Sequence, residues 1–217
     1  MPYEQFDRTK LNIKPLSDRK DKVYIERDHV PVTSQPARFS DKGQAVIDEA
    51  VKRLIRAREA GKSRMLTFGA HSIKNGLGPV IIKLIEDGWI THLATNGAGI
   101  IHDWEFAFQG HSSEDVRGNV SRGEFGTWQE TGFYINLAIV VGAYNGMGYG
   151  ESVGALVENE GLEIPSETEL RDEIVAKAKF YPAESAAAAD LLDTILRFKL
   201  EPGWLKVPHP FKKYGLQ

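Results

Sequence analysis

The stretch from residue 64 to residue 95 constrains the fold most, because it sets two short apolar runs on either side of a helical pattern. RMLTF (64–68) predicts a buried strand, and WITHLAT (89–95) predicts a second strand. Between them, a glycine-rich turn leads into a helix that Gly88 ends. The inward face of this helix should carry Val80, Ile81, Leu84 and Ile85. Strand, helix and strand in this order predict a βαβ unit with two parallel strands and a right-handed crossover.

The rest of the chain is mainly helical in pattern. A helix that begins after Ser40 or Asp41 carries an apolar stripe between Val46 and Ile55 and ends at Gly61. Further helices are predicted over 112–120, 128–144, 166–178 and 185–198, the third of them opened by the capping-box sequence SETE. We divide the chain into an irregular arm (1–39), with one strand near 22–25, and an α/β nucleotide-binding domain (40–217).

The composition narrows the classes of function. Hydrophobic residues make up 41% of the 217 residues and charged residues 26%, which is typical of a globular protein. The formal net charge of -3 and the lack of a basic stripe argue against nucleic acid as a partner. There is no cysteine, which excludes disulfides and thiolate chemistry. The N-terminus has no apolar signal core and no apolar run approaches the length of a membrane span, so we expect a cytoplasmic protein without membrane contact.

Two unusual loops follow the two strands of the βαβ unit. They read GAHSIKNGLG (69–78) and TNGAGIIHDWE (95–105). The carboxyl ends of parallel strands meet at one edge of a sheet, where open α/β folds bind ligands. Glycines there let backbone N–H groups approach a phosphate, and Ser72, Asn75 and Asn96 add polar side chains. Ordinary strand-to-helix turns also use Gly and Asn, so a purely structural role stays open.

The histidines and carboxylates give weaker signals. No HExxH or HxH pattern is present, so no metal site is predicted. His92 alternates within a strand and is interpreted as a packed core histidine, and Glu105 and the carboxylates after it mostly as surface groups. His102 is a candidate proton donor or hydrogen-bond partner, and Asp103 an acceptor for ribose hydroxyls or a substrate amine. Adjacent residues on a helix or strand do not share a face, so these two side chains should not act at one point.

The two loops and their spacing resemble the nucleotide-binding part of deoxyhypusine synthase. That family joins a glycine-flanked Thr-Ser-Asn turn, a helix, a strand that ends in Thr-Thr-Ala-Gly-Gly, and an acidic cluster. Ser72 matches the serine of the turn, and Asp103 matches the last acid of the cluster. The second loop is matched by Thr95, Gly97, Ala98 and Gly99. The likeness covers about residues 63–140.

The resemblance implies a Rossmann-like parallel sheet flanked by helices, with NAD lying across its carboxyl edge. It also implies a homo-oligomer, typically a tetramer, and a small-molecule substrate, which in the family is the polyamine spermidine. The cofactor would be held by Ser72, Asn75, Thr95, Asn96, Gly97, Ala98, Gly99 and Asp103. His102 and Asp103 are the candidate catalytic residues, with His102 as the acid-base group.

The chain departs from the family in two respects. Ile101 and His102 stand where the family has an acidic pair, so a cationic polyamine would lose carboxylate partners. No lysine here can be matched to the family's catalytic lysine, which lies well downstream of its nucleotide loops. We therefore expect a fragment or a diverged relative of a longer enzyme that acts on an amine or another small polar metabolite. The alternatives are a non-catalytic ligand-sensing or assembly protein, and a hydrolase that uses His102 or His111 with a carboxylate.

Overall fold

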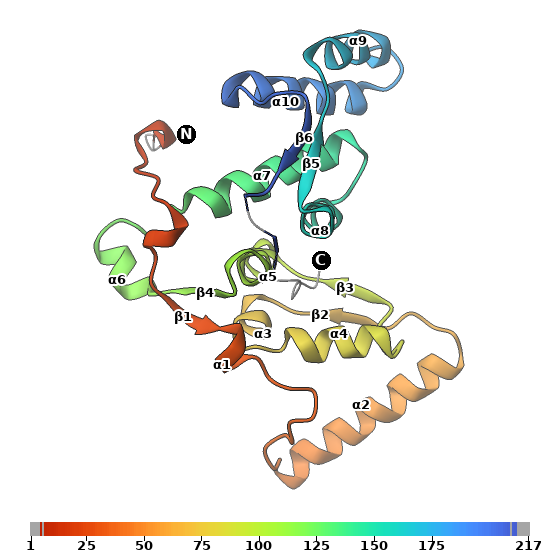
Figure 1. Cartoon of the computed structure of the whole chain (residues 1–217). Coiled ribbons are helices and arrows are strands. Elements are labelled where there is room, and N and C mark those ends of the chain that lie inside the picture. The colour runs from red at the N-terminus through yellow and green to blue at the C-terminus, as the bar shows by residue number, and fades with distance from the viewer. Residues whose placement is uncertain (1–4, 6, 209, 212–217) are drawn as a thin grey trace.

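The computed structural model describes residues 5, 7–208, 210 and 211, and these form a mixed α/β molecule (Figure 1). Among them, the strands make three separate two-stranded sheets, and helices make up most of the remaining structure. The elements are η1 (Arg8–Lys10), η2 (Leu16–Asp18), β1 (Asp21–Tyr24), α1 (Ile25–Asp28), α2 (Asp41–Glu59), β2 (Met65–Thr67), α3 (Ala70–Lys74), α4 (Gly78–Glu86), β3 (His92–Ala94), α5 (Gly97–Gln109), β4 (His111–Glu114), α6 (Val116–Ser121), α7 (Gln129–Tyr144), α8 (Tyr149–Asn159), β5 (Gly161–Ile164), α9 (Glu167–Lys177), α10 (Pro182–Phe198) and β6 (Gly203–Lys206).

The predicted parallel pair is confirmed. β2 and β3 pair in parallel with Leu66 opposite Leu93, and α3 and α4 lie between them in sequence. A larger Rossmann-like sheet is not formed by the described residues, since each of these strands has three residues and no further strand joins the pair. The prediction of a buried strand at 64–68 is also wrong. Met65 is 65% exposed, and His92 on β3 is exposed rather than packed in a core.

The N-terminal arm packs on its own chain. β1 pairs antiparallel with β4, with Val23 opposite Ser112, which confirms the strand predicted near 22–25. Leu16 and Arg19 of the arm are buried. The helix predicted over 112–120 is wrong in its first half, because β1 recruits residues 111–114 into a strand and α6 begins only at Val116. A contact this distant in sequence leaves no local trace in the pattern.

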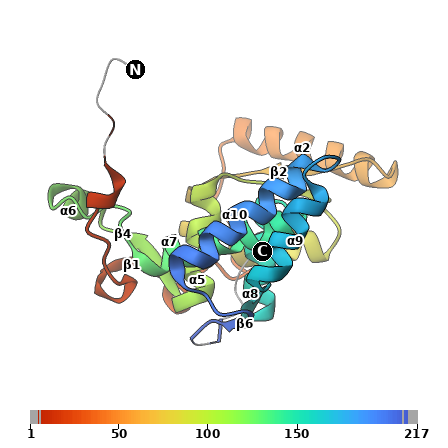
Figure 2. The ribbon, with the colours of Figure 1, turned by 90° about the horizontal axis from the view of Figure 1, so that it is seen from above.

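The C-terminal part is a helical layer. Figures 1 and 2 show α9 and α10 side by side, above α7 and α8. The capping box at the start of α9 is confirmed, because the Ser166 side chain accepts from the Glu169 N–H and the Glu169 carboxylate accepts from the Ser166 N–H at 2.8 Å. α8, β5 and β6 had no clear sequence signal. β6 pairs antiparallel with β5, so the tail contributes a strand that the pattern did not indicate.

Helix α5 joins two apolar clusters. Its Trp104, Ala107 and Phe108 belong to the larger cluster, which includes buried side chains of α7, α8 and α10. Its Phe106 belongs to a smaller cluster with Ile25, Ile73 and Ile81, beneath the β2–β3 pair. Because α5 is buried on both sides, the loop at its N-terminus is held in a fixed position relative to the strands.

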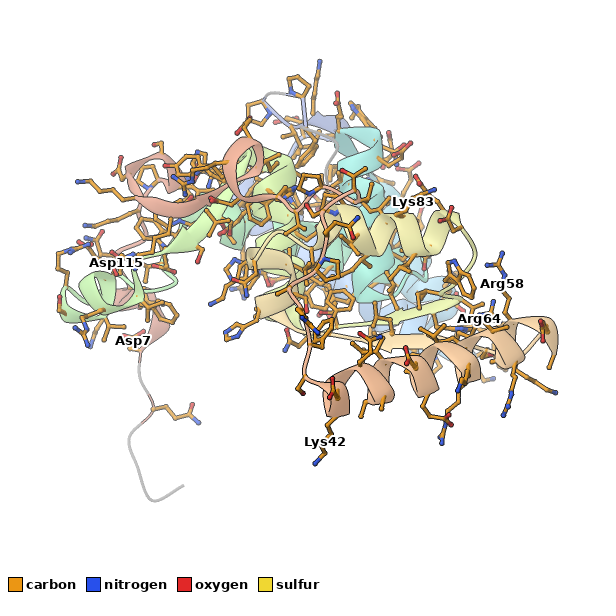
Figure 3. The ribbon with its side chains drawn as sticks, turned by 90° about the horizontal axis from the view of Figure 1, so that it is seen from below. Asp7, Lys42, Arg58, Arg64, Lys83 and Asp115 are labelled. Carbon is orange, nitrogen blue, oxygen red and sulfur yellow. The ribbon has the colours of Figure 1, made fainter. Side chains whose placement is uncertain are left out.

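The apolar stripe of α2 does not pack against the rest of the described chain. No residue of this 19-residue helix is buried, and Val46 is 65% exposed. Figure 3 shows α2 along the edge of the molecule, with Lys42 pointing away from the body. Its C-terminal end is attached by Arg58, whose guanidinium lies 4.4 Å from the Trp89 ring centroid. Ile85 on α4 is also predicted to face inward. This prediction is wrong, because Ile85 is 38% exposed.

Candidate functional site

The sequence TNGAGIIHDWE forms the start of α5. β3 ends at Ala94, and the Asn96 side chain caps the helix by accepting from the Gly99 N–H at 3.0 Å. A Cβ at Gly99 would overlap the Thr95 hydroxyl, so this glycine is required by the close approach of the loop to the helix. Asn96 and Gly99 therefore have structural roles. The N–H groups of Gly97 and Ala98 stand in the first turn, where no helix carbonyl can reach them.

A cavity of about 400 Å³ opens at this point, beside the carboxyl ends of β2 and β3. Thr95, Asn96 and Gly99 line it from the loop, and Asp103 from the next turn of α5. The Asp103 side chain is buried, with 3% of the residue exposed. Apolar walls are supplied by Phe68, Ile73, Leu93, Ile100 and Tyr149. Apolar walls with a few polar groups are typical of small-molecule sites, whose volumes run from roughly 300 to 1,000 Å³.

Several of the predicted cofactor residues lie elsewhere, since Gly97 lines neither this cavity nor its neighbour and Ala98 lines only the neighbour. Ser72 and Asn75 line neither this cavity nor its neighbour. The Ser72 N–H donates to the Gly69 carbonyl within the turn, and Asn75 ends α3 as an exposed residue. Gly76 beside them adopts φ +83° and lies against the Asp28 backbone. Ser72, Asn75 and Gly76 thus serve the strand-to-helix turn and the docking of α1, whereas Ala70, His71 and Lys74 of the same loop line the neighbouring cavity.

A second cavity of about 620 Å³ lies on the other side of the N-terminal turn of α5. Ala98 and His102 line it, whereas Asp103 lines the first cavity, so the adjacent pair points to two different sites as the helical geometry requires. Tyr149 lies in the wall of both cavities. The two spaces are therefore neighbours, and a dinucleotide or a cofactor with its substrate could share them.

The floor of the second cavity is a buried ion pair. Arg19 from the arm makes two hydrogen bonds of 2.7 Å to the two oxygens of Glu105, and its Nε lies 2.6 Å from Asp21. Glu105 is 1% exposed, which corrects its interpretation as a surface group. Burial alone would lower the pKa of Arg19, but hydrogen bonds and charge from Glu105 and Asp21 outweigh it and raise that pKa. Arg19 therefore remains charged.

This ion pair fixes the state of His102. Ser112 donates to the Glu105 carboxylate at 2.5 Å, so the Ser112 oxygen can only accept from His102 Nδ1, 2.7 Å away. We therefore assign the proton of neutral His102 to Nδ1, which leaves Nε2 as an acceptor. Burial lowers the pKa of His102. The charges of Lys74 and Arg19 also lower this pKa, whereas the charge of Glu105 raises it. Among the described residues, no hydrogen bond to Nε2 is formed.

The backbone beside this network is strained. Ser113 adopts φ +74°, a left-handed conformation that costs energy for a residue with a side chain. It lets Ser112 point inward while Ser113 and Glu114 both line the second cavity. Glu114 accepts hydrogen bonds from Asn119 at 2.6 Å and Trp128 at 3.1 Å. Strain at a cavity wall is typical of a site that the surrounding structure holds in place for a ligand.

His111 belongs to the ion cluster rather than to a cavity. Its Nδ1 lies 2.6 Å from Asp21, and it lines neither of the two cavities described above. In the part of the chain that the structure describes, no group of three or more His, Asp or Glu side chains is placed to hold a metal ion. Nor does any described helix have both the length and the apolar character needed to span a membrane.

Comparison with protein-family models, with curated proteins and with solved structures gave no match to this chain.

Proposed function

We propose that the chain is a deoxyhypusine synthase-like protein that binds NAD in the first cavity and oxidises an amine or another small polar metabolite in the second. The observation that carries this proposal is the cavity at the carboxyl ends of β2 and β3, bounded by the N-terminus of α5 and by buried Asp103. A helix N-terminus favours phosphate through its free N–H groups and its dipole. An aspartate is suited to accept hydrogen bonds from ribose hydroxyls.

The residues present fit this cofactor in three respects. The first turn of α5, whose Asn96 and Gly99 line the cavity, leaves N–H groups available for a phosphate. Apolar side chains such as Phe68 and Ile100 line the cavity and suit a flat ring. Tyr149 links this cavity to the one that contains His102, where the substrate would lie. When bound, NAD would supply a hydride acceptor, while His102 would take up a proton from the substrate.

The decisive experiment is calorimetric titration of NAD into the purified chain and into matched variants. Thr95→Glu adds a negative charge in the wall of the first cavity, beside the N-terminus of α5, and Thr95→Gln is the neutral control of similar size. We expect the Glu variant to bind NAD about tenfold more weakly than the Gln variant, because one like charge near a phosphate costs on the order of 1 kcal/mol. Asp103→Asn should weaken binding by about 1–3 kcal/mol through loss of a buried acceptor.

Folded variants that bind NAD as tightly as the wild type would remove the cofactor assignment from this cavity. Saturable NAD binding without turnover of any amine or alcohol would instead favour a ligand-sensing protein. The hydrolase alternative has less support, because the Ser112 proton is held by Glu105 and His111 lines neither cavity.

A further inference from the structure

Two of the polar groups in the second cavity, on His102 and Lys74, are left available to a ligand by the structure around them. The His102 ring is fixed through Nδ1 by Ser112, so Nε2 is its free acceptor. Lys74 ends α3 on the same cavity wall, and it forms no ion pair with the described residues. Its positive charge acts on the pKa of His102, which places the two side chains within electrostatic range of each other. Within the described chain, an unpaired cation thus lies near an unpaired acceptor.

The carboxylates of this cavity are already used. Both oxygens of Glu105 are occupied by Arg19, with further hydrogen bonds from Ser112 and from Thr131 at 3.0 Å. Glu114 accepts from Asn119 and Trp128 side chains and from a backbone N–H. A cationic amine would find no carboxylate free to receive it among the described residues that line this cavity. The groups that remain favour the opposite charge, an anion at Lys74.

The other residues that line the cavity are mostly apolar or aromatic, with His71, Ser113 and Asn136 as further polar residues. The apolar part is formed by Ile101, Phe125, Trp128, Ile135, Ile139 and Tyr149. Such walls suit a short carbon chain, and polar groups placed at one side of an apolar pocket fix the orientation of a ligand. The cavity therefore combines one binding point for an anionic group, one for a hydrogen-bond donor, and an apolar space for the carbon chain that carries both groups.

We propose that the second cavity binds a small hydroxy acid. Lys74 holds its carboxylate, and His102 Nε2 accepts the hydrogen of its hydroxyl group. This assignment rests on the proposed function, because it names the substrate class of that function. Binding of the hydroxy acid itself needs no cofactor. With NAD as oxidant, the hydroxyl carbon loses its hydrogen with the bonding electron pair to the nicotinamide ring. The hydroxyl proton passes to His102 Nε2, and the hydroxy acid becomes an oxo acid.

The test uses three probes on the full chain: 2-hydroxyhexanoate, hexanoate and 1,4-diaminobutane. We expect 2-hydroxyhexanoate to bind about tenfold more tightly than hexanoate, the scale of one hydrogen bond to a fixed acceptor, and diaminobutane not to saturate. Lys74→Gln should weaken both carboxylates by about tenfold, whereas Lys52→Gln on α2 should change neither. His102→Leu should abolish the preference for the hydroxyl group and leave hexanoate binding in place.

Several outcomes would overturn the hydroxy acid site. These are tighter binding of diaminobutane than of the carboxylates, equal binding of both carboxylates, or unchanged binding in folded Lys74→Gln. Failure of all three probes to bind the folded chain would do the same. NAD titration separates this result from the proposed function. Retained NAD binding without hydroxy acid binding removes only the substrate class, and hydroxy acid binding without NAD binding removes only the cofactor.

Discussion

His102 owes its chemical state to residues that do not touch a ligand. Arg19 donates to Glu105, Glu105 accepts a hydrogen bond from Ser112, and Ser112 in turn accepts from His102. Thr131 adds a further donor to Glu105 at 3.0 Å. Each of these hydrogen bonds constrains the next, so the buried network favours one arrangement of its groups. The reactivity of the ring is therefore set by an ion pair that joins the N-terminal arm to α5.

The lowered pKa of His102 has a consequence for stability. Its pKa in the folded chain lies below the ordinary value of 6.5, chiefly because of burial, and the pKa of His29 is lowered for the same reason. As the pH falls through about 6.5, the unfolded chain takes up protons before the folded chain does. The free energy of unfolding should therefore fall with pH in this window, and this loss should stop below the folded pKa values.

Urea unfolding from about pH 8 to about pH 5 measures this effect. We expect His102→Gln, which can still donate to Ser112, to lose less stability over this range than the wild type. His92→Gln, which removes an exposed histidine from β3, is the matched control for the substitution itself. Identical profiles for the wild type and His102→Gln would show that His102 does not resist protonation in the folded state.

At the scale of elements, the contact between α7 and α8 depends on a small residue. Gly142 is buried in α7, and a Cβ there would overlap the side chain of Ser152 on α8. Gly142→Ala should therefore lower the free energy of unfolding by about 1–3 kcal/mol, the usual cost of overpacking. Gly132 lies in the same helix, and nothing lies within 4 Å of the position that an alanine Cβ would take there. Gly132→Ala should therefore be stabilising by up to about 1 kcal/mol.

A double variant identifies the cause. In a Ser152→Gly background the overlapping atoms are gone, so adding Gly142→Ala should cost much less than it does in the wild type. Denaturation midpoints of the four proteins give the coupling energy. Equal costs of Gly142→Ala in both backgrounds would mean that the glycine serves the backbone of α7 rather than its contact with α8.

Sequence reasoning worked where the signal was local. The parallel pair of β2 and β3, the helix over 128–144 and the Ser166 cap were all predicted. It failed where partners come from distant residues. Neither Arg19 in the arm nor Tyr149 on α8 carries a local pattern that links it to α5. Glu105 could have been placed beside His102 from their spacing of three residues, once Asn96 was recognised as the cap of one continuous helix.

At the scale of the whole molecule, stability should be uneven. The large apolar cluster holds α7, α8 and α10 to α5, whereas α2 contributes no buried side chain to either cluster. Most of a helix's stability in a protein comes from packing of its apolar face. α2 retains local support from pairs such as Arg53 with Glu49, 2.8 Å apart, and such exposed pairs contribute only about 0.3–0.5 kcal/mol.

We therefore expect the amides of α2 to exchange with deuterium through local opening, well before those of α7 and α10, which should exchange near global unfolding. Hydrogen exchange followed by mass spectrometry at two protein concentrations measures this directly. Protection of α2 that rises with concentration would mean that a second copy covers its apolar stripe, in agreement with the expected homo-oligomer. Protection equal to that of α7 at both concentrations would contradict the unequal stability, because α2 would then open only with the whole chain.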